Sequence, residues 1–209
     1  MLHLYNYYRS SASFRVRIAL YLKKIPFKDI EVHLVKDGGK QNSEDFEKLN
    51  PQKLVPVLKH GKKVITQSLA IIDYLEDISK KTPLYSKSKE KRAFEKSFAL
   101  SIACELSPLN NLKVLNYLTK EFKISDSLKN DWYHHWVKET FTALEKLVSE
   151  ESTRFCSGDK PTVADICLVP QIYNARRFEC NLDDYPNLVR IDKNCRFLEA
   201  VQKAWPKDI

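Results

Sequence analysis

Three hydroxyl side chains are crowded into a short segment near the start of the chain, at Ser10, Ser11 and Ser13. The segment lies between a predicted strand at 2–7 and a predicted helix that ends near Leu22. The first N–H groups of a helix have no partner within the helix, and the helix dipole makes that end positive. Hydroxyl and N–H donors together would stabilise a thiolate or a carboxylate there. A serine that only caps the helix fits the same pattern, and the segment alone favours that interpretation.

A second pair of polar side chains, Gln67 and Ser68, begins another predicted helix, whose positive end would suit an α-carboxylate. Between the two helices, Pro56 interrupts a strand-like segment, because proline cannot donate a hydrogen bond to a sheet. The Val55–Pro56 bond is therefore either cis or part of an ordinary trans loop. A cis bond would leave the N–H and C=O of Val55 able to pair with an extended peptide. Two serine-rich helix starts and this proline predict a receptor for a short anionic peptide.

The elements that would position these residues alternate between strands and helices. In order, we expect a strand at 2–7, a helix at 12–22, a strand at 27–35, a short helix at 43–49, two strands that end near residue 66, and a helix at 66–78. This is a β-α-β-α-β-β-α unit. A polar segment that includes Pro83 then breaks the pattern. We therefore predict a first domain at 1–80, a linker at 81–88, and a second, all-helical domain at 89–209.

The second half carries two patterns that packing explains without a ligand. Aromatic and leucine side chains at helical spacing along 125–148 predict a buried face; they are Trp132, Trp136, Leu144 and Leu147. Thr162 followed by Asp165 is a capping-box pattern, in which the carboxylate complements the helix dipole. A catalytic acid at Asp165 is the weaker interpretation. Arg177 follows an apolar helix, and from the sequence alone it is a surface arginine.

Composition excludes several classes of protein. The chain has 209 residues, a net charge of +8 and five cysteines, without a C-x-x-C pair or a recognisable signal peptide. These cysteines favour free thiols in a reducing cytoplasm, and no apolar segment is long enough to span a membrane. His134 and His135 are adjacent and point to different helix faces, so we predict no metal site. The spread lysines indicate a solvated basic surface; a nucleic-acid binder stays open as an alternative, although no arginine block alternates with aromatics.

Three segments together resemble the zeta-class glutathione transferases, the maleylacetoacetate isomerases. They read RSSASFRVRIAL at 9–20, LNPQKLVP at 49–56 and QSLAIIDYL at 67–75, and the likeness extends from about residue 2 to residue 200. The resemblance implies a thioredoxin-like N-terminal domain followed by a helical bundle. One position departs from the family, because Ala12 stands where the pattern Ser-Ser-Cys has cysteine. Without a protein thiolate near this turn, disulfide exchange is impossible there, and thiol chemistry would have to come from a bound thiol.

The resemblance also implies a cofactor, glutathione, and the residues that would hold it. Ser10 would be the main donor to its sulfur and Ser11 the second. The remaining glutathione-binding residues would be Val55 and Pro56 along its backbone, Gln67 and Ser68 at the γ-glutamyl carboxylate, Gln41 at the glycyl end, and Asn111 near the same cleft.

The implied activity is the glutathione-dependent conversion of maleylacetoacetate to fumarylacetoacetate in tyrosine and phenylalanine catabolism. Arg9, Arg15 and Arg177 would hold the negative charges of the substrate, with Arg15 pointing inward and taking part in catalysis. The family implies a homodimer. Two alternatives remain: a zeta-class transferase that acts on small α-halo acids, and a non-catalytic interaction module with this fold, which Ala12 supports best.

Overall fold

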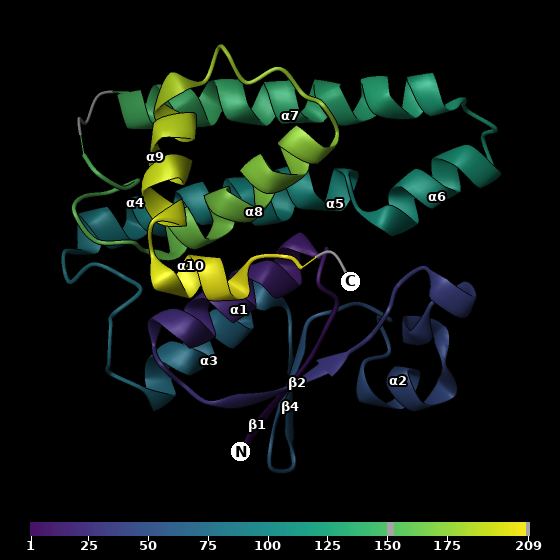
Figure 1. Ribbon diagram of the computed structural model, residues 1–209, viewed down its shortest axis with the longest axis horizontal. Coiled ribbons are helices and arrows are strands. Elements are labelled where there is room, and N and C mark those ends of the chain that lie inside the picture. Colours follow the sequence, from purple (N-terminus) through teal and green to yellow (C-terminus); the bar gives the residue numbers. More distant parts are fainter. Residues whose placement is uncertain (150–152, 208–209) are drawn as a thin grey trace. The chain divides into compact units, whose positions relative to one another are not determined.

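A four-stranded mixed sheet in the order β2-β1-β3-β4 is the frame of the N-terminal part of the chain (Figure 1). Its strands are β1 (Leu2–Asn6), β2 (Phe27–Glu31), β3 (Val57–His60) and β4 (Lys63–Thr66). β1 runs parallel to β2, with Leu2 opposite Phe27, and antiparallel to β3, with Leu4 opposite Leu58. β3 and β4 form a hairpin. The predicted succession of strands and helices and the thioredoxin-like fold class are confirmed.

The helices of this part are α1 (Ser11–Leu22), α2 (Glu44–Leu49), α3 (Ser68–Ile78) and α10 (Glu199–Ala204), with two short 3₁₀ turns, η1 (Lys36–Gly38) and η2 (Lys40–Asn42). α1 packs against both α3 and α10. Phe46 of α2 is buried in a separate cluster with Tyr7, Val32 and Val55. The second strand is shorter than predicted, because the chain turns after Val32, where the ring Nδ1 of His33 accepts hydrogen bonds from two later N–H groups.

The computed structural model describes residues 1–149 and 153–207, and these form two compact units. The first comprises 1–84 and the segment from Leu198 onward, and the second comprises Tyr85–Phe197. The second unit contains α4 (Lys89–Leu100), a π-helical turn η3 (Ser101–Leu106), α5 (Ser107–Leu109), α6 (Leu112–Lys120), α7 (Asp126–Ser149), α8 (Val163–Arg177) and α9 (Pro186–Arg196). α8 is buried along almost its whole length and packs against α4 and α9.

By its contacts, the segment from Leu198 onward groups with the first unit, whereas the predicted second domain at 89–209 includes it. Helix α9 ends at Arg196, and the short helix α10 that follows packs on α1. Arg17 of α1 donates from Nε to the carbonyl oxygen of Ala204 at 3.0 Å, and the rings of Phe14 and Trp205 meet edge-on at 5.5 Å. These contacts join residues nearly two hundred positions apart, which local sequence patterns do not record.

The predicted buried face of α7 is correct only in part. Leu144 is fully buried, and Trp132 and Trp136 are half-buried, but Leu147 is 48% exposed. The residues of α7 that pack inward with Leu144 are Tyr133, Val137, Phe141 and Val148. Successive residues of a helix point about 100° apart, so Leu147 does not share the inward direction of its neighbour Val148.

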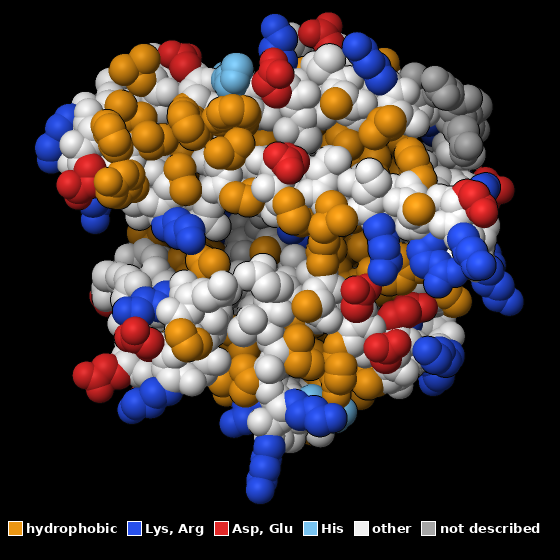
Figure 2. Space-filling view, turned by 180° about the vertical axis from the view of Figure 1, so that it is seen from behind, with side chains coloured by type: hydrophobic (Ala, Val, Ile, Leu, Met, Phe, Trp, Pro, Cys, Tyr) orange, Lys and Arg blue, Asp and Glu red, His pale blue; other side chains and the backbone are white. Residues whose placement is uncertain are grey.

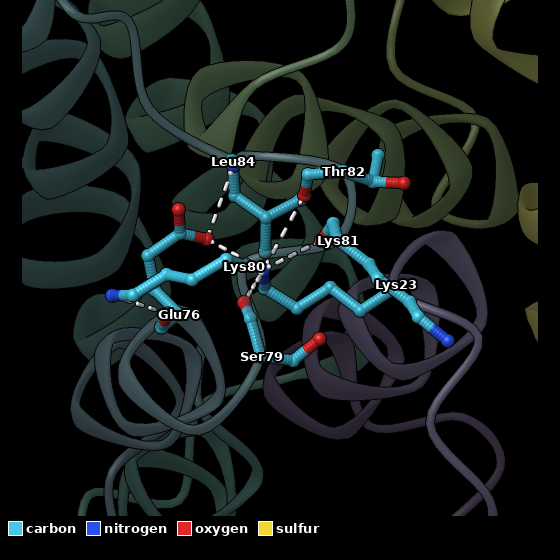
Figure 3. A network of polar contacts seen from close by, with 7 residues as sticks. All are labelled: Lys23, Glu76, Ser79, Lys80, Lys81, Thr82 and Leu84. Atoms are coloured by element: carbon cyan, nitrogen blue, oxygen red, sulfur yellow. Dashed lines mark hydrogen bonds and ion pairs between the residues drawn. The ribbon is translucent and has the colours of Figure 1, made fainter.

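A buried lysine fixes the segment that follows α3 (Figure 3). The ammonium group of Lys23, whose side chain is fully buried, donates to the carbonyl oxygens of Ser79 and Lys81 at 2.8 and 3.0 Å. It also pairs with the carboxylate of Glu76 at 2.8 Å, and that carboxylate accepts from the N–H of Leu84 at 3.1 Å. Removing one partner of a buried pair leaves an uncompensated charge, so the cluster ties α1 to the 79–84 segment.

The distribution of surface charge and of metal-ligating side chains is relevant to nucleic-acid binding and to metal binding, the two functions considered from the composition. On the face shown in Figure 2, Lys and Arg side chains lie interspersed with Asp and Glu. The described residues include no group of three or more His, Cys, Asp or Glu side chains that could hold a metal ion. None of the helices described is both long enough and apolar enough to cross a membrane.

Candidate functional site

Ser10 caps α1, and its hydroxyl is only partly used. Ser10 has extended backbone angles, and its Oγ accepts a hydrogen bond from the N–H of Ser13 at 3.2 Å. Among the described residues, the hydroxyl of Ser11 and the main-chain N–H groups of Ser11 and Ala12 have no hydrogen-bond partner. The capping interpretation is therefore correct, and it still leaves the O–H groups of both serines and two N–H groups available at the positive end of the helix.

The turn that leads into Ser10 is held by a buried guanidinium that the sequence analysis did not assign to the site. Arg17 is 6% exposed and donates to the side-chain oxygen of Asn6 at 2.8 Å and to the carbonyl oxygen of Tyr8 at 2.9 Å. The N–H of Ser10 donates to the carbonyl oxygen of Tyr7 at 3.0 Å. An arginine in an otherwise apolar helix was the available signal, because a buried guanidinium needs several acceptors.

The start of α3 brings a second hydroxyl together with a second buried arginine. Ser68 is 6% exposed and Arg15 is 2% exposed, and Arg15 Nη1 donates to Ser68 Oγ at 3.3 Å. Within the described part of the chain, the O–H of Ser68 has no acceptor. Arg15 thus points inward, as predicted, and Ser68 is one of the residues it contacts.

Gln67 precedes Ser68 in an unusual backbone conformation. Its φ of 67° lies in the left-handed region that residues other than glycine rarely adopt, at a typical cost of about 1–3 kcal/mol. Its side chain is exposed, and Nε2 donates to Gln52 Oε1 at 2.9 Å. The first turn of α3 contains no acidic residue that would offset the helix dipole.

The Val55–Pro56 bond is cis, which decides between the two alternatives left by the sequence. Both residues are buried, and in the described chain neither the N–H nor the C=O of Val55 has a hydrogen-bond partner. The carbonyl oxygen of Leu54, by contrast, accepts from Asn50 Nδ2 at 2.7 Å. An unpaired N–H and C=O on one residue can pair with the main chain of an extended peptide.

Gln41 lies against its own loop. Its Nε2 donates to the carbonyl oxygen of Leu34 at 3.1 Å, and its buried Oε1 has no hydrogen-bond partner among the described residues. Gly39, at φ +89°, makes this contact possible, because a Cβ there would lie 2.4 Å from Gln41 Nε2. The second N–H of its Nε2 has no acceptor among the described residues.

The three remaining predicted site residues have separate local roles. Asn111 caps α6, where its Oδ1 accepts from the N–H of Lys113 at 3.0 Å. Arg177 is exposed in the second unit, with its guanidinium 4.8 Å from the centre of the Phe178 ring. Arg9 is exposed in the first unit and lies in the same way over Tyr8, at 5.1 Å.

Asp165 closes the start of α8, as the sequence predicted. One carboxylate oxygen accepts from the N–H of Thr162 at 2.8 Å and the other from the N–H of Cys156 at 2.9 Å. The residue is 1% exposed, and this burial raises its pKa above the usual aspartate value. With both oxygens bound to the backbone and almost no solvent access, the carboxylate has a structural role.

The cysteines lie outside the first unit, and burial raises the pKa of three of them. All five are free thiols, and the first in the sequence is Cys104, exposed in η3. Burial raises the pKa of Cys156 and Cys195, and it raises the pKa of half-buried Cys180 to about 11. A reactive thiol needs a lowered pKa, so a thiolate at the start of α1 has to come from a ligand.

Two family models match this chain. The N-terminal domain of glutathione S-transferase matches residues 4–83, and the C-terminal domain of glutathione S-transferase matches residues 110–204. The residues between the two matches, 84–109, include α4 and η3 of the second unit.

Named relatives align over almost the whole length. The probable maleylacetoacetate isomerase of Vibrio cholerae is 41% identical over 205 residues, which are 98% of this chain and 95% of the relative. The structure is similar to the holo structure of a bacterial maleyl pyruvate isomerase described as a zeta-class glutathione S-transferase, with a TM-score of 0.94, 38% identity and coverage of 98% and 96%. It is equally similar to a maleylacetoacetate isomerase from Methylobacterium extorquens AM1 with malonate and glutathione bound, at a TM-score of 0.94, 35% identity and the same coverage.

Proposed function

Because this chain belongs to the glutathione transferase family, with maleylacetoacetate isomerases and zeta-class proteins among its relatives, we propose that it is a glutathione-dependent cis–trans isomerase. The substrate we propose is maleylacetoacetate, and the product is fumarylacetoacetate, an intermediate of tyrosine and phenylalanine catabolism. The observation that carries this proposal is the set of unpaired donors at the start of α1, in a unit that also presents unpaired groups at Val55 and Ser68.

The free groups of the first unit fit the parts of glutathione. The hydroxyls of Ser10 and Ser11 suit an anionic sulfur, the N–H and C=O of Val55 suit the cysteinyl main chain, and the O–H of Ser68 suits the γ-glutamyl carboxylate. Asn111, which the family resemblance adds, belongs to the second unit, and its Nδ2 donates to no acceptor among the described residues. Gln41 would donate the second N–H of its Nε2 to the glycyl carboxylate while the first stays on the carbonyl oxygen of Leu34.

When bound, glutathione supplies a thiolate that can add reversibly to a conjugated double bond and so allow rotation about that bond. The residues of this chain make that thiolate available. A free thiol has a pKa near 8.5, and lowering it by about two units requires about 2.7 kcal/mol. Two hydroxyl donors and the open N–H groups of Ser11 and Ala12 can supply that amount at a helix start. The serines act as hydrogen-bond donors, because their hydroxyls remain protonated at neutral pH.

Two exposed arginines are our candidates for holding the substrate. Arg9 and Arg177 each stack on a neighbouring aromatic ring, which limits the motion of the side chain and leaves the guanidinium accessible. A guanidinium binds a carboxylate through two parallel hydrogen bonds. Maleylacetoacetate carries carboxylates, so loss of either arginine should raise KM more than it lowers kcat.

The proposal extends to a cytoplasmic homodimer. The free cysteines support a reducing compartment, since exposed thiols such as Cys104 would otherwise be open to oxidation. The dimer follows from family resemblance, and sedimentation equilibrium would measure it directly.

The test is a glutathione-dependent isomerisation assay with maleylacetoacetate. We expect turnover that requires glutathione, and we expect Ser10→Ala to lose most of it while circular dichroism shows an unchanged fold. Ala12→Cys, which restores the residue of the family pattern, is the matched gain-of-function variant. Retention on a glutathione column without turnover by any of these proteins would contradict the isomerase and support the non-catalytic module. Unchanged turnover in Ser10→Ala would remove Ser10 from the mechanism.

A further inference from the structure

We infer that Arg15 is a positioning residue for the γ-glutamyl carboxylate of glutathione and that it acts through Ser68. This inference rests on the proposed function and deepens it, because it assigns a carboxylate subsite with a buried cation behind its hydroxyl. It differs from the direct contact with the substrate that the sequence predicts for Arg15.

The geometry places the arginine behind the serine. Arg15 lies on α1 and Ser68 at the start of α3, and these helices pack against each other. The guanidinium Nη1 donates to Ser68 Oγ at 3.3 Å, and both residues are more than nine-tenths buried. A guanidinium has no acceptor atom, so Ser68 must be the acceptor in this contact. Its own O–H has no acceptor among the described residues and is therefore available to donate to a ligand.

The chemistry of that free O–H points to an anion. A donor that already accepts a hydrogen bond from a cation is polarised, and its own hydrogen bond becomes stronger. The nearby positive charge is poorly screened, because Arg15 is almost completely buried. The first turn of α3 adds the positive end of a helix of eleven residues and carries no acidic side chain. A carboxylate within reach of Ser68 would meet all of these contributions at once.

Arg17 provides a matched control within the same helix. It is also buried, but it donates to Asn6 Oδ1, to the carbonyl oxygen of Tyr8 and to that of Ala204, and none of these acceptors belongs to the start of α3. Loss of Arg17 should therefore disturb the turn before Ser10 and the docking of α10. It should not change how the protein distinguishes a ligand carboxylate from a neutral group.

The experiment compares two ligands by isothermal titration calorimetry. One is glutathione, and the other is its analogue with the α-carboxylate of the γ-glutamyl residue converted to a primary carboxamide. The unmodified protein should bind glutathione at least tenfold more tightly than the carboxamide. Arg15→Gln and Ser68→Ala should each remove most of that preference, and the double variant should remove no more than the stronger single variant, because the two residues act as one unit. Arg17→Gln should retain the preference even if it weakens both ligands.

Each result either supports the inference or overturns it. Equal weakening of both ligands by Arg15→Gln, in a protein whose circular dichroism is unchanged, would make Arg15 a structural residue and overturn the inference. Equal affinity of the unmodified protein for both ligands would overturn it as well, although glutathione binding and the proposed function would stand. If Arg15→Gln does not fold, Ser68→Ala and the comparison of the two ligands on the unmodified protein decide the outcome. Failure of the unmodified protein to bind glutathione at all would refute the proposed function instead.

Discussion

The starts of α8 and α1 are both capped, but their N–H groups are satisfied in different ways. At α8, both oxygens of Asp165 accept from backbone N–H groups, and the carboxylate is buried. At α1, the neutral hydroxyl of Ser10 accepts one N–H, and the donors of Ser11 remain unpaired among the described residues. A carboxylate of the protein itself occupies the N–H groups at the start of α8, which we call the closed start. The start of α1, which we call the open start, keeps donors that could bind an anionic ligand.

This difference separates structural caps from candidate binding sites. A built-in carboxylate neutralises the positive end of the helix dipole and occupies its donors, so a second anion would be repelled. The first turns of α1 and α3 have no acidic residue, and each start has a serine O–H with no acceptor among the described residues. Serine alone is less informative, because Ser43 and Ser88 cap α2 and α4, whose first turns do carry acidic residues.

The largest effect on stability should come from removing the carboxylate at the start of α8. Asp165→Ala would leave the N–H groups of Cys156 and Thr162 buried without acceptors, and each unsatisfied donor costs about 1–3 kcal/mol. We expect a loss of about 3 kcal/mol or more in the free energy of unfolding, measured by urea denaturation. Thr162→Ala is the control, and it should cost about 1 kcal/mol. If Asp165→Ala lowers the free energy of unfolding by less than 1 kcal/mol, the carboxylate is not needed to satisfy the N–H groups at the start of α8, and the contrast with α1 fails.

The converse change adds a carboxylate to the start of α1. Ser10→Asp would keep the cap and place an anion where we propose the thiolate of glutathione lies. We expect glutathione affinity to fall about 100-fold, equivalent to about 2.7 kcal/mol, while the thermal midpoint stays the same or rises slightly. Calorimetry and a thermal melt measure the two quantities.

Ser10→Asn separates charge from shape in that experiment, because asparagine caps a helix without carrying a charge. It should bind glutathione much better than Ser10→Asp does. Equal affinities for the two variants would mean that the sulfur does not lie at this helix start.

A smaller effect concerns the backbone of Gln67, which opens α3. Glycine adopts a φ of 67° without steric cost, so Gln67→Gly should stabilise the fold by up to about 1 kcal/mol or leave it unchanged. The same variant loses the side-chain amide and should bind glutathione more weakly. Destabilisation by more than 1 kcal/mol in urea would show that the contact between Gln67 and Gln52 outweighs the strain.

The smallest effect is a pH dependence of the free energy of unfolding that arises from Asp165 at the start of α8. Burial raises the pKa of Asp165 in the folded state, so the contribution of this group to stability is complete below the usual aspartate pKa and is lost as the pH rises through the raised value. Asp165→Asn does not titrate. The unfolding free energy of the natural protein should therefore fall relative to that of Asp165→Asn between pH 3.5 and pH 7. A difference that does not vary with pH would contradict the assigned direction.

The sequence predicted well those features that depend on neighbouring residues. The caps at Ser10 and Asp165 and the strand and helix order follow from patterns a few residues long, and Pro56 limited the backbone to two alternatives, of which cis is correct. Local patterns could not predict that Arg15 contacts Ser68, because 53 positions separate them. For the same reason the attachment of α10 to α1 through Arg17 was missed. Long-range partners of buried polar groups depend on the packed structure, which the sequence pattern does not contain.

The hydrogen bonds and the ion pair of Lys23 also determine how this part of the fold responds to chelators and to added salt. Converging carbonyl oxygens and a carboxylate are the ligands with which proteins bind dissolved metal cations. Here a covalently attached ammonium takes that position, within 3.0 Å of Ser79 O, Lys81 O and Glu76 Oε2. This corner of the protein therefore carries its own counter-ion, so chelators have nothing to extract from it, and added electrolyte screens the buried pair far less than a surface one.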